Sequence, residues 1–115
     1  MIQPDGGILR GTLDVLILKA LTWEPLHGYA IVDWIVRATE STVLLDEGTI
    51  YPALHRLHKK GWITAEWGLS DNNRRAKFYA LTRLGRTQLR TETSMWEQYA
   101  VAVTKALRVT RALTR

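Results

Sequence analysis

The sequence contains no cysteine, which excludes a disulfide framework and thiolate chemistry. It has no apolar run near the roughly 20 residues that cross a bilayer. Residues 1–5 also lack the basic region followed by an apolar one that marks a signal peptide. A cysteine-free chain is compatible with a reducing compartment. We therefore expect a cytoplasmic protein that has no membrane partner.

Motifs that would indicate an enzyme are also missing. The sequence has no G-x-S-x-G nucleophile elbow and no glycine loop that could cradle a phosphate. The only adjacent acidic pair, Asp46 and Glu47, stands where it would stabilise a helix N-terminus. His55 and His58 could share a metal only with further ligands, and their helix face offers none. We expect no enzymatic activity, no cofactor and no metal site.

Positive charge is concentrated in the C-terminal part of the chain. The 115 residues suit one domain, and a hydrophobic content of 46% is typical of a globular fold. Residues 1–73 hold 6 Lys/Arg against 9 Asp/Glu, whereas residues 74–115 hold 10 against 2. The net charge of +5 therefore arises from one region. Such a distribution favours a polyanionic partner, chiefly nucleic acid, with a membrane surface as the weaker alternative.

Residues 46–61 are typical of a short helix with two different faces. Acidic residues open the segment and lysines close it, Pro52 suits a first turn, and Gly61 suits a C-cap. We expect about three turns beginning near Thr49, with successive residues about 100° apart. One face is apolar and the other carries hydroxyl, imidazole and cationic groups without a carboxylate. The apolar face holds Ile50, Ala53, Leu54 and Leu57; the other holds Tyr51, Pro52, His55, Arg56 and Lys59, flanked by Thr49 and His58.

Two helices precede this segment. Residues 1–8 predict a flexible arm, residues 9–21 a first helix and residues 27–39 a second helix with Tyr29 on its inner face. Val15 and Leu18 lie off the main apolar stripe of the first helix and need a second surface, in their own domain or on another chain. We assign them to a dimer interface. Residues 42–45 are β-prone and suggest a stub of strand.

A hairpin follows. Residues 62–67 alternate with period two and place Ile63, Ala65 and Trp67 on one side, residues 68–73 have turn chemistry, and residues 74–81 return as a strand. Three helices and then a hairpin predict a mainly α, α+β fold of the winged helix-turn-helix type. The third helix would enter the major groove of DNA. The turn residues of the wing could reach a minor groove, the alternative being a solvated hairpin tip.

A long helix is predicted from Thr82 to Thr110, about 42 Å at 1.5 Å per residue. It would project beyond a compact domain, and yet its far half is apolar, which favours a second copy related by a two-fold axis. We divide the chain into the arm at 1–8, a winged-helix domain at 9–82 and a dimerisation helix at 83–115. The residues predicted at the dimer interface are Val15, Leu18, Tyr99, Ala100, Val103 and Leu107.

The candidate DNA contacts divide by role. Residues near the start of the third helix suit base edges: Thr49, Tyr51, Pro52 and His55. Cations suit phosphates: Arg56, Lys59, Lys60, Arg75 and Lys77. The wing tip adds Asn72, Asn73 and Arg74. The partner would be a pseudo-palindromic double-stranded operator bound by a homodimer. The alternative is a winged-helix module that binds proteins and has no DNA specificity of its own.

Four motifs, in order and at suitable spacing, resemble the PadR family of bacterial transcriptional regulators. They are His27-Gly28-Tyr29, Glu47-Gly48-Thr49-Ile50-Tyr51-Pro52-Ala53-Leu54 with Arg56-Leu57, Gly61-Trp62-Ile63, and Arg75-x-Lys77-Phe78-Tyr79-x-Leu81-Thr82-x-x-Gly85.

The resemblance to this family implies a winged-helix dimer that binds operator DNA, usually as a repressor. It implies DNA contacts by Tyr51 and its neighbours and backbone contacts by Arg75 and Lys77, and it places the chain in the short subfamily. Some short members bind planar aromatic compounds at the dimer interface, where a tryptophan stacks on the ligand. Trp96 occupies that kind of position, the alternative being a core residue that fills a helix junction.

Overall fold

The computed structural model describes residues 8–114, and for residues 8–10 it describes the backbone only. Its elements are α1 (Ile8–Ala20), β1 (Leu26–His27), α2 (Gly28–Ala38), α3 (Glu47–Lys59), β2 (Ile63–Leu69), β3 (Arg75–Leu81) and α4 (Arg83–Leu107). Within the described range the fold is thus mainly helical with a small antiparallel sheet, and the predicted winged helix-turn-helix architecture is confirmed. Of the predicted N-terminal arm, residues 1–7 lie outside the described residues, and residue 8 begins α1.

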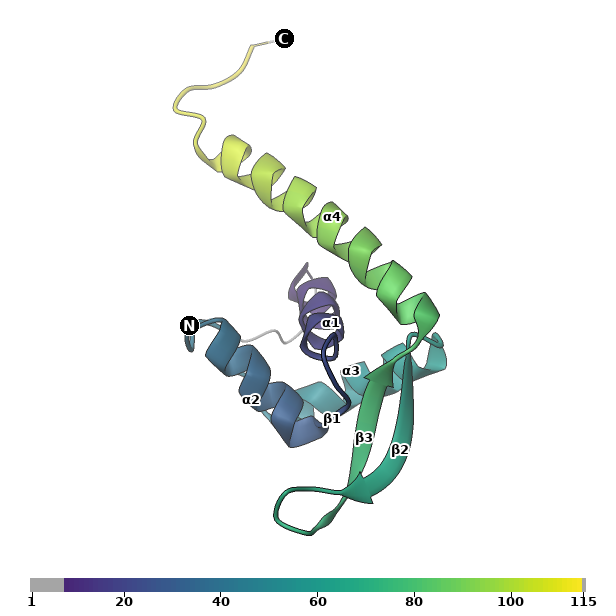
Figure 1. Cartoon of the computed structure of the whole chain (residues 1–115). Coiled ribbons are helices and arrows are strands. Elements are labelled where there is room, and N and C mark those ends of the chain that lie inside the picture. The colour runs from purple at the N-terminus through teal and green to yellow at the C-terminus, as the bar shows by residue number, and fades with distance from the viewer. Residues whose placement is uncertain (1–7, 115) are drawn as a thin grey trace.

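The elements surround α1 (Figure 1). On one side α1 contacts α2 and α3, and on the other it contacts the first half of α4. The β2–β3 hairpin and the free end of α4 extend from the body in different directions, which gives extents of 62 × 29 × 21 Å. The molecule therefore consists of a compact head with two projections.

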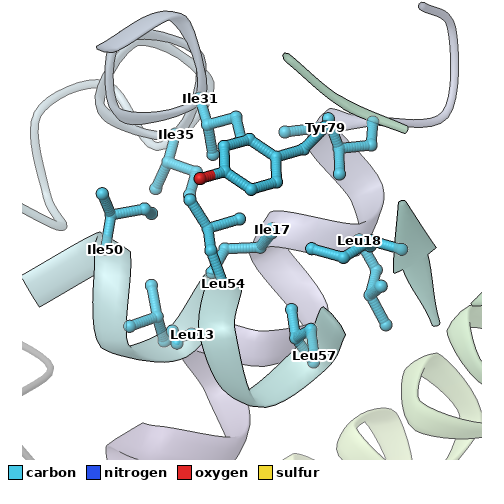
Figure 2. Close-up of a cluster of buried hydrophobic side chains, with 13 residues drawn as sticks. Leu13, Ile17, Leu18, Ile31, Ile35, Ile50, Leu54, Leu57 and Tyr79 are labelled. Atoms are coloured by element: carbon cyan, nitrogen blue, oxygen red, sulfur yellow. The ribbon is translucent and has the colours of Figure 1, made fainter. Parts of the chain in front are cut away.

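The core of the head is built where three apolar helix faces meet (Figure 2). It combines side chains of α1, α2, α3 and the sheet: Leu13, Ile17, Leu18, Ile31, Ile35, Ile50, Leu54, Leu57 and Tyr79. Leu18 is fully buried there, so its assignment to a dimer interface is corrected. The second surface that Leu18 needed is supplied by its own domain, since Leu18 belongs to one buried cluster with side chains of α2, α3 and the sheet.

The starts of α2 and α3 each have a side-chain cap. The Asp46 carboxylate accepts the backbone N–H of Thr49 at 3.0 Å, and the ring of His27 accepts that of Ala30 at 3.3 Å. These bonds satisfy donors that a helix N-terminus leaves free. The Asp46 cap explains why α3 begins at Glu47, two residues before the predicted start at Thr49.

The sheet differs from the prediction in one strand. β2 and β3 pair antiparallel with Trp67 opposite Lys77, as the alternating pattern indicated, and β1 adds to the other edge of β3. Residues 42–45 form no regular strand, and only Val43 makes an isolated β-bridge. Glu40 and Ser41 have φ of 51° and 62°, and the Ser41 N–H bonds the Val36 carbonyl at 2.8 Å. Residues 39–41 are thus a turn that ends α2 and leads into this single bridge.

A tight junction sets the direction of α4. The Thr82 N–H donates to the Trp62 carbonyl at 3.1 Å, and the Thr82 hydroxyl donates to the Gly61 carbonyl at 2.7 Å. The same hydroxyl caps α4 by accepting the Gly85 N–H at 2.9 Å. Gly85 lies so close to Trp62 that a Cβ would be 2.0 Å from the carbonyl oxygen. Only glycine allows this approach.

We predict that Gly85→Ala lowers the free energy of unfolding by about 3 kcal/mol, because the Trp62 carbonyl must move and release Thr82. Denaturant unfolding followed by circular dichroism would measure the change. Gly11→Ala is the matched control, since a Cβ at Gly11 meets nothing within 4 Å and alanine is worth up to about 1 kcal/mol in a helix. Equal stabilities of the Gly85→Ala variant and the wild type would contradict the proposed junction.

Candidate nucleic-acid interface

Helix α3 has one buried and one open face, as its sequence predicted. Ile50, Ala53, Leu54 and Leu57 are buried, each at most 2% exposed. The opposite face is open along its whole length and carries Tyr51, Pro52, His55, His58, Lys59 and Lys60. The burial of the apolar side holds the helix firmly against the head. Its polar side is left free to meet a partner.

Tyr51 owes its position to a glycine on α2. Its ring lies over Gly28, where a Cβ would be 2.7 Å from the Tyr51 hydroxyl oxygen. Burial, and then the nearby charge of Glu47, raise the pKa of Tyr51 above its usual value. Burial, and then Tyr51, likewise raise the pKa of Tyr79. The Tyr51 hydroxyl therefore stays protonated around neutral pH, and at 44% exposure it is available as a hydrogen-bond donor.

An open groove of about 1160 Å³ separates the starts of α2 and α3 from the wing. Its wall on the wing is cationic, with Arg74, Arg75 and Lys77. Tyr29 also lines the groove and is exposed, so its prediction on the inner face of α2 is wrong. Tyr29 and Ile31 are two residues apart on α2, about 200° round the helix, so Tyr29 points away from the core that buries Ile31.

Acidic side chains also line this groove, which the sequence reasoning missed. They are Asp33, Glu47 and Asp71. The absence of a carboxylate on the polar face of α3 was inferred from a helix assumed to start near Thr49. The helix begins at Glu47, and one turn separates Glu47 from Tyr51 on that face. The groove therefore has Arg74, Arg75 and Lys77 on the wing, with Asp71 at the wing turn and Asp33 and Glu47 on the facing helices.

The wing tip is a tight turn that leaves its polar side chains exposed. The Ser70 N–H donates to the Arg74 carbonyl at 2.8 Å, and the Ser70 hydroxyl donates to the side-chain oxygen of Asn72 at 2.5 Å. Asn73 has a φ of 60°, a conformation that asparagine tolerates better than most residues. Asn72, Asn73 and Arg74 are all exposed. The tip thus presents amide and guanidinium groups on a constrained backbone.

Arg56 does not face the groove. Its guanidinium forms a salt bridge with Asp14 of α1, and the two side chains are only 28% and 12% exposed. The pair joins α3 to α1 across 42 positions of sequence. Arg56 was predicted to bind phosphate, and the structure corrects this because its charge is already neutralised inside the head. Thr49 is also engaged, since its hydroxyl donates to the Asp46 carboxylate at 3.1 Å.

A second, apolar groove of about 550 Å³ lies between α1 and α4. Val15 and Leu16 line it from α1, and Leu89 and Trp96 from α4. The Trp96 indole N–H donates to the Thr12 hydroxyl at 3.2 Å, while 47% of the residue remains exposed. Trp96 is therefore not a core residue. It stands at the edge of a groove where a flat molecule has access to its ring.

Beyond this groove α4 leaves the head with apolar side chains uncovered. Tyr99 and Leu107, predicted at a dimer interface, are exposed, and Ala100 and Val103 are partly so. Of the residues that the structure describes, none belongs to a helix long and apolar enough to cross a membrane. No cluster of three or more His, Asp or Glu suited to a metal occurs among residues 8–114 either.

The sequence matches a known family over residues 17–91, the Transcriptional regulator PadR-like family. The chain belongs to this family. Membership makes it a DNA-binding transcriptional regulator and not an enzyme, as the sequence predicted.

Known proteins are similar over most of the chain. An uncharacterised protein of Lysinibacillus sphaericus is 34% identical over 99 residues, which cover 85% of this chain and 88% of that protein. The crystal structure of a PadR-like transcriptional regulator from Bacillus cereus has a TM-score of 0.73 at 26% identity, covering 90% and 98% of the two chains. A PadR family regulator from Eggerthella lenta has a TM-score of 0.72 at 31% identity, covering 88% and 86%.

The contacts described above explain several residues of the PadR motifs in this chain. Gly28 admits the Tyr51 ring, Thr82 caps α4 and bonds the end of α3, and Gly85 admits the Trp62 carbonyl. The motif residues therefore mainly position the elements of the head. The individual DNA contacts assigned to the side chains on the open face remain predictions.

We predict that Asp14→Ala lowers the free energy of unfolding by about 2 kcal/mol, less than for a fully buried pair, because it leaves Arg56 without a partner. Arg56→Met should lower stability similarly and leave the salt dependence of DNA binding unchanged. Lys59→Met is the matched control, and it should keep its stability but reduce the salt dependence of DNA binding. The assignment fails if Arg56→Met keeps its stability and reduces the slope of log K against log salt by about one.

Proposed function

We propose that this PadR regulator binds a pseudo-palindromic operator as a homodimer in the cytoplasm, represses transcription, and is released by a small planar aromatic compound. One observation carries the DNA-binding mode: Tyr51 of α3 and Arg75 and Lys77 of the wing line the same open groove. A helix with a free polar face beside a cationic hairpin suits a major groove flanked by phosphates.

In this binding mode the open face of α3 reads bases and the cations hold the backbone. Residues near the start of the helix contact base edges: Tyr51, Pro52 and His55. Thr49 joins them, although its hydroxyl is also bonded to the Asp46 carboxylate. The phosphates fall to Lys59, Lys60, Arg75 and Lys77, and the wing tip with Asn72, Asn73 and Arg74 meets a minor groove. Arg56 is left out because Asp14 holds it. Glu47 beside Tyr51 disfavours phosphate there, which supports a base-facing role for this end of α3.

The proposed dimer rests on the surface of α4. Tyr99 and Leu107 are 52% and 80% exposed on a helix that extends past the head. Ala100 and Val103 are partly exposed on the same helix face. Uncovered apolar side chains in such a row are costly in water, and a second α4 would bury them. Two heads related by a two-fold axis would then present two α3 helices to successive half-sites.

The proposed effector site is the groove between α1 and α4. It is lined mainly by apolar groups, and the Trp96 ring offers a flat stacking surface at its edge. Trp96, which lines this groove, precedes Tyr99 of the proposed dimer contact by one helical turn. A planar compound bound there would lie close to both chains.

We predict that DNA affinity falls steeply with salt, by about 0.9 in log K per decade of salt for each phosphate contact. Lys59→Ala should weaken binding to all sequences alike, by about tenfold at most, because a phosphate contact carries no base information. Fluorescence anisotropy with duplex DNA would measure both effects. Lys105→Ala, an exposed cation of α4, is the control. A changed sequence preference in the Lys59 variant would contradict its role.

We predict that a planar aromatic dye quenches the fluorescence of Trp96 and that Trp96→Ala removes this quenching, because the ring is the stacking surface. Titration of the dye with both proteins would show the difference. Trp23→Ala, which removes another exposed tryptophan, should leave dye binding intact. Tight binding that survives Trp96→Ala would exclude this site.

A further inference from the structure

Trp67 on the wing is a large aromatic residue that the fold does not bury. It is 60% exposed on β2, directly opposite Lys77 on β3. Ala65 and Tyr79 form the neighbouring cross-strand pair, and Tyr79 is buried in the core. Because side chains alternate along a strand, the hairpin face that packs on the core continues outward as the face that carries Trp67. That face borders the groove beside α3.

Two cations lie on the Trp67 ring. The guanidinium carbon of Arg75 is 4.7 Å from the ring centroid, and the ammonium nitrogen of Lys77 is 5.6 Å from it. Arg75 pairs with Leu69 in the register, so it reaches Trp67 diagonally across the hairpin, while Lys77 reaches it directly. The negative face of an aromatic ring attracts both groups and offsets their mutual repulsion.

From this arrangement we infer that Trp67 is a positioning residue for DNA binding, which holds Arg75 and Lys77 together toward the groove before DNA arrives. The inference rests on the proposed binding mode. Free arginine and lysine side chains lose rotamer freedom when they bind phosphate. Stacking on a rigid indole removes part of that freedom in advance, so less is lost on binding.

The burial pattern separates this role from a structural one. The base of the hairpin is anchored by Ile63 and Tyr79, both buried, whereas Trp67 stands beyond them in solvent. Trp62 offers a contrast. The Lys60 ammonium nitrogen lies 4.6 Å from its ring centroid, but Trp62, directly before β2, is partly buried against the core. The Trp62 ring therefore packs against the core, whereas the exposed Trp67 ring contacts the cations of Arg75 and Lys77.

A double-mutant cycle tests the inference with a pool of random-sequence duplex DNA at low salt, where phosphate contacts dominate affinity. Trp67→Ala should weaken binding about fivefold. Arg75→Ala with Lys77→Ala should weaken it more, and adding Trp67→Ala to that pair should cause no further loss. Trp67→Phe should bind like the wild type, whereas Trp67→Leu should behave like Trp67→Ala.

Thr64→Ala, on the opposite face of β2, is the control, and thermal unfolding confirms that each variant is folded. If the wild type does not bind the duplex pool, the proposed binding mode itself fails. The positioning role is overturned if the wild type binds and Trp67→Ala binds equally well. It is also overturned if adding Trp67→Ala to the Arg75→Ala and Lys77→Ala pair weakens binding by the same factor as Trp67→Ala alone. A Trp67→Leu variant with full affinity overturns it too, since leucine supplies bulk without an aromatic face.

Discussion

The burial of α1 is the constraint on which the rest of the structure depends. Its side chains Leu13, Ile17 and Leu18 are at most 3% exposed, because α1 contacts α2 and α3 on one side and α4 on the other. A helix that packs against three others fixes the relative positions of its neighbours, because close-packed interiors do not deform continuously. The angle at which α3 presents its open face is thereby set from within the head.

The cations of α3 are divided between the interior of the head and its surface. Arg56 turns inward to Asp14, where partial burial makes the ion pair costly to break, and Lys59 stays in solvent. Two cations three residues apart on one helix thus serve different ends. Their separation explains why net charge alone overstates the cations available to a polyanion. The wing compensates, since Arg75 and Lys77 gather on one exposed ring.

The order of elements and the two faces of α3 could be predicted because hydrophobic periodicity depends on local spacing. Contacts between residues distant in sequence could not. The two-residue strand β1 exists only because β3 lies beside it, and nothing in the apolar pattern of α1 distinguishes Leu18 in the core from Val15 in a groove. A helical wheel likewise places Arg56 near the border of the open face without showing Asp14. The open face of α3 was predictable, and which of its side chains remain free was not.

The two proposed sites share α1. Within a little more than one turn, Thr12 and Leu16 border the effector groove and Asp14 holds Arg56 of α3. A ligand that displaces Trp96 from Thr12 acts on the same turn that positions the recognition helix. Such a contact becomes regulatory only if the ligand binds the two arrangements of α1 with different affinity.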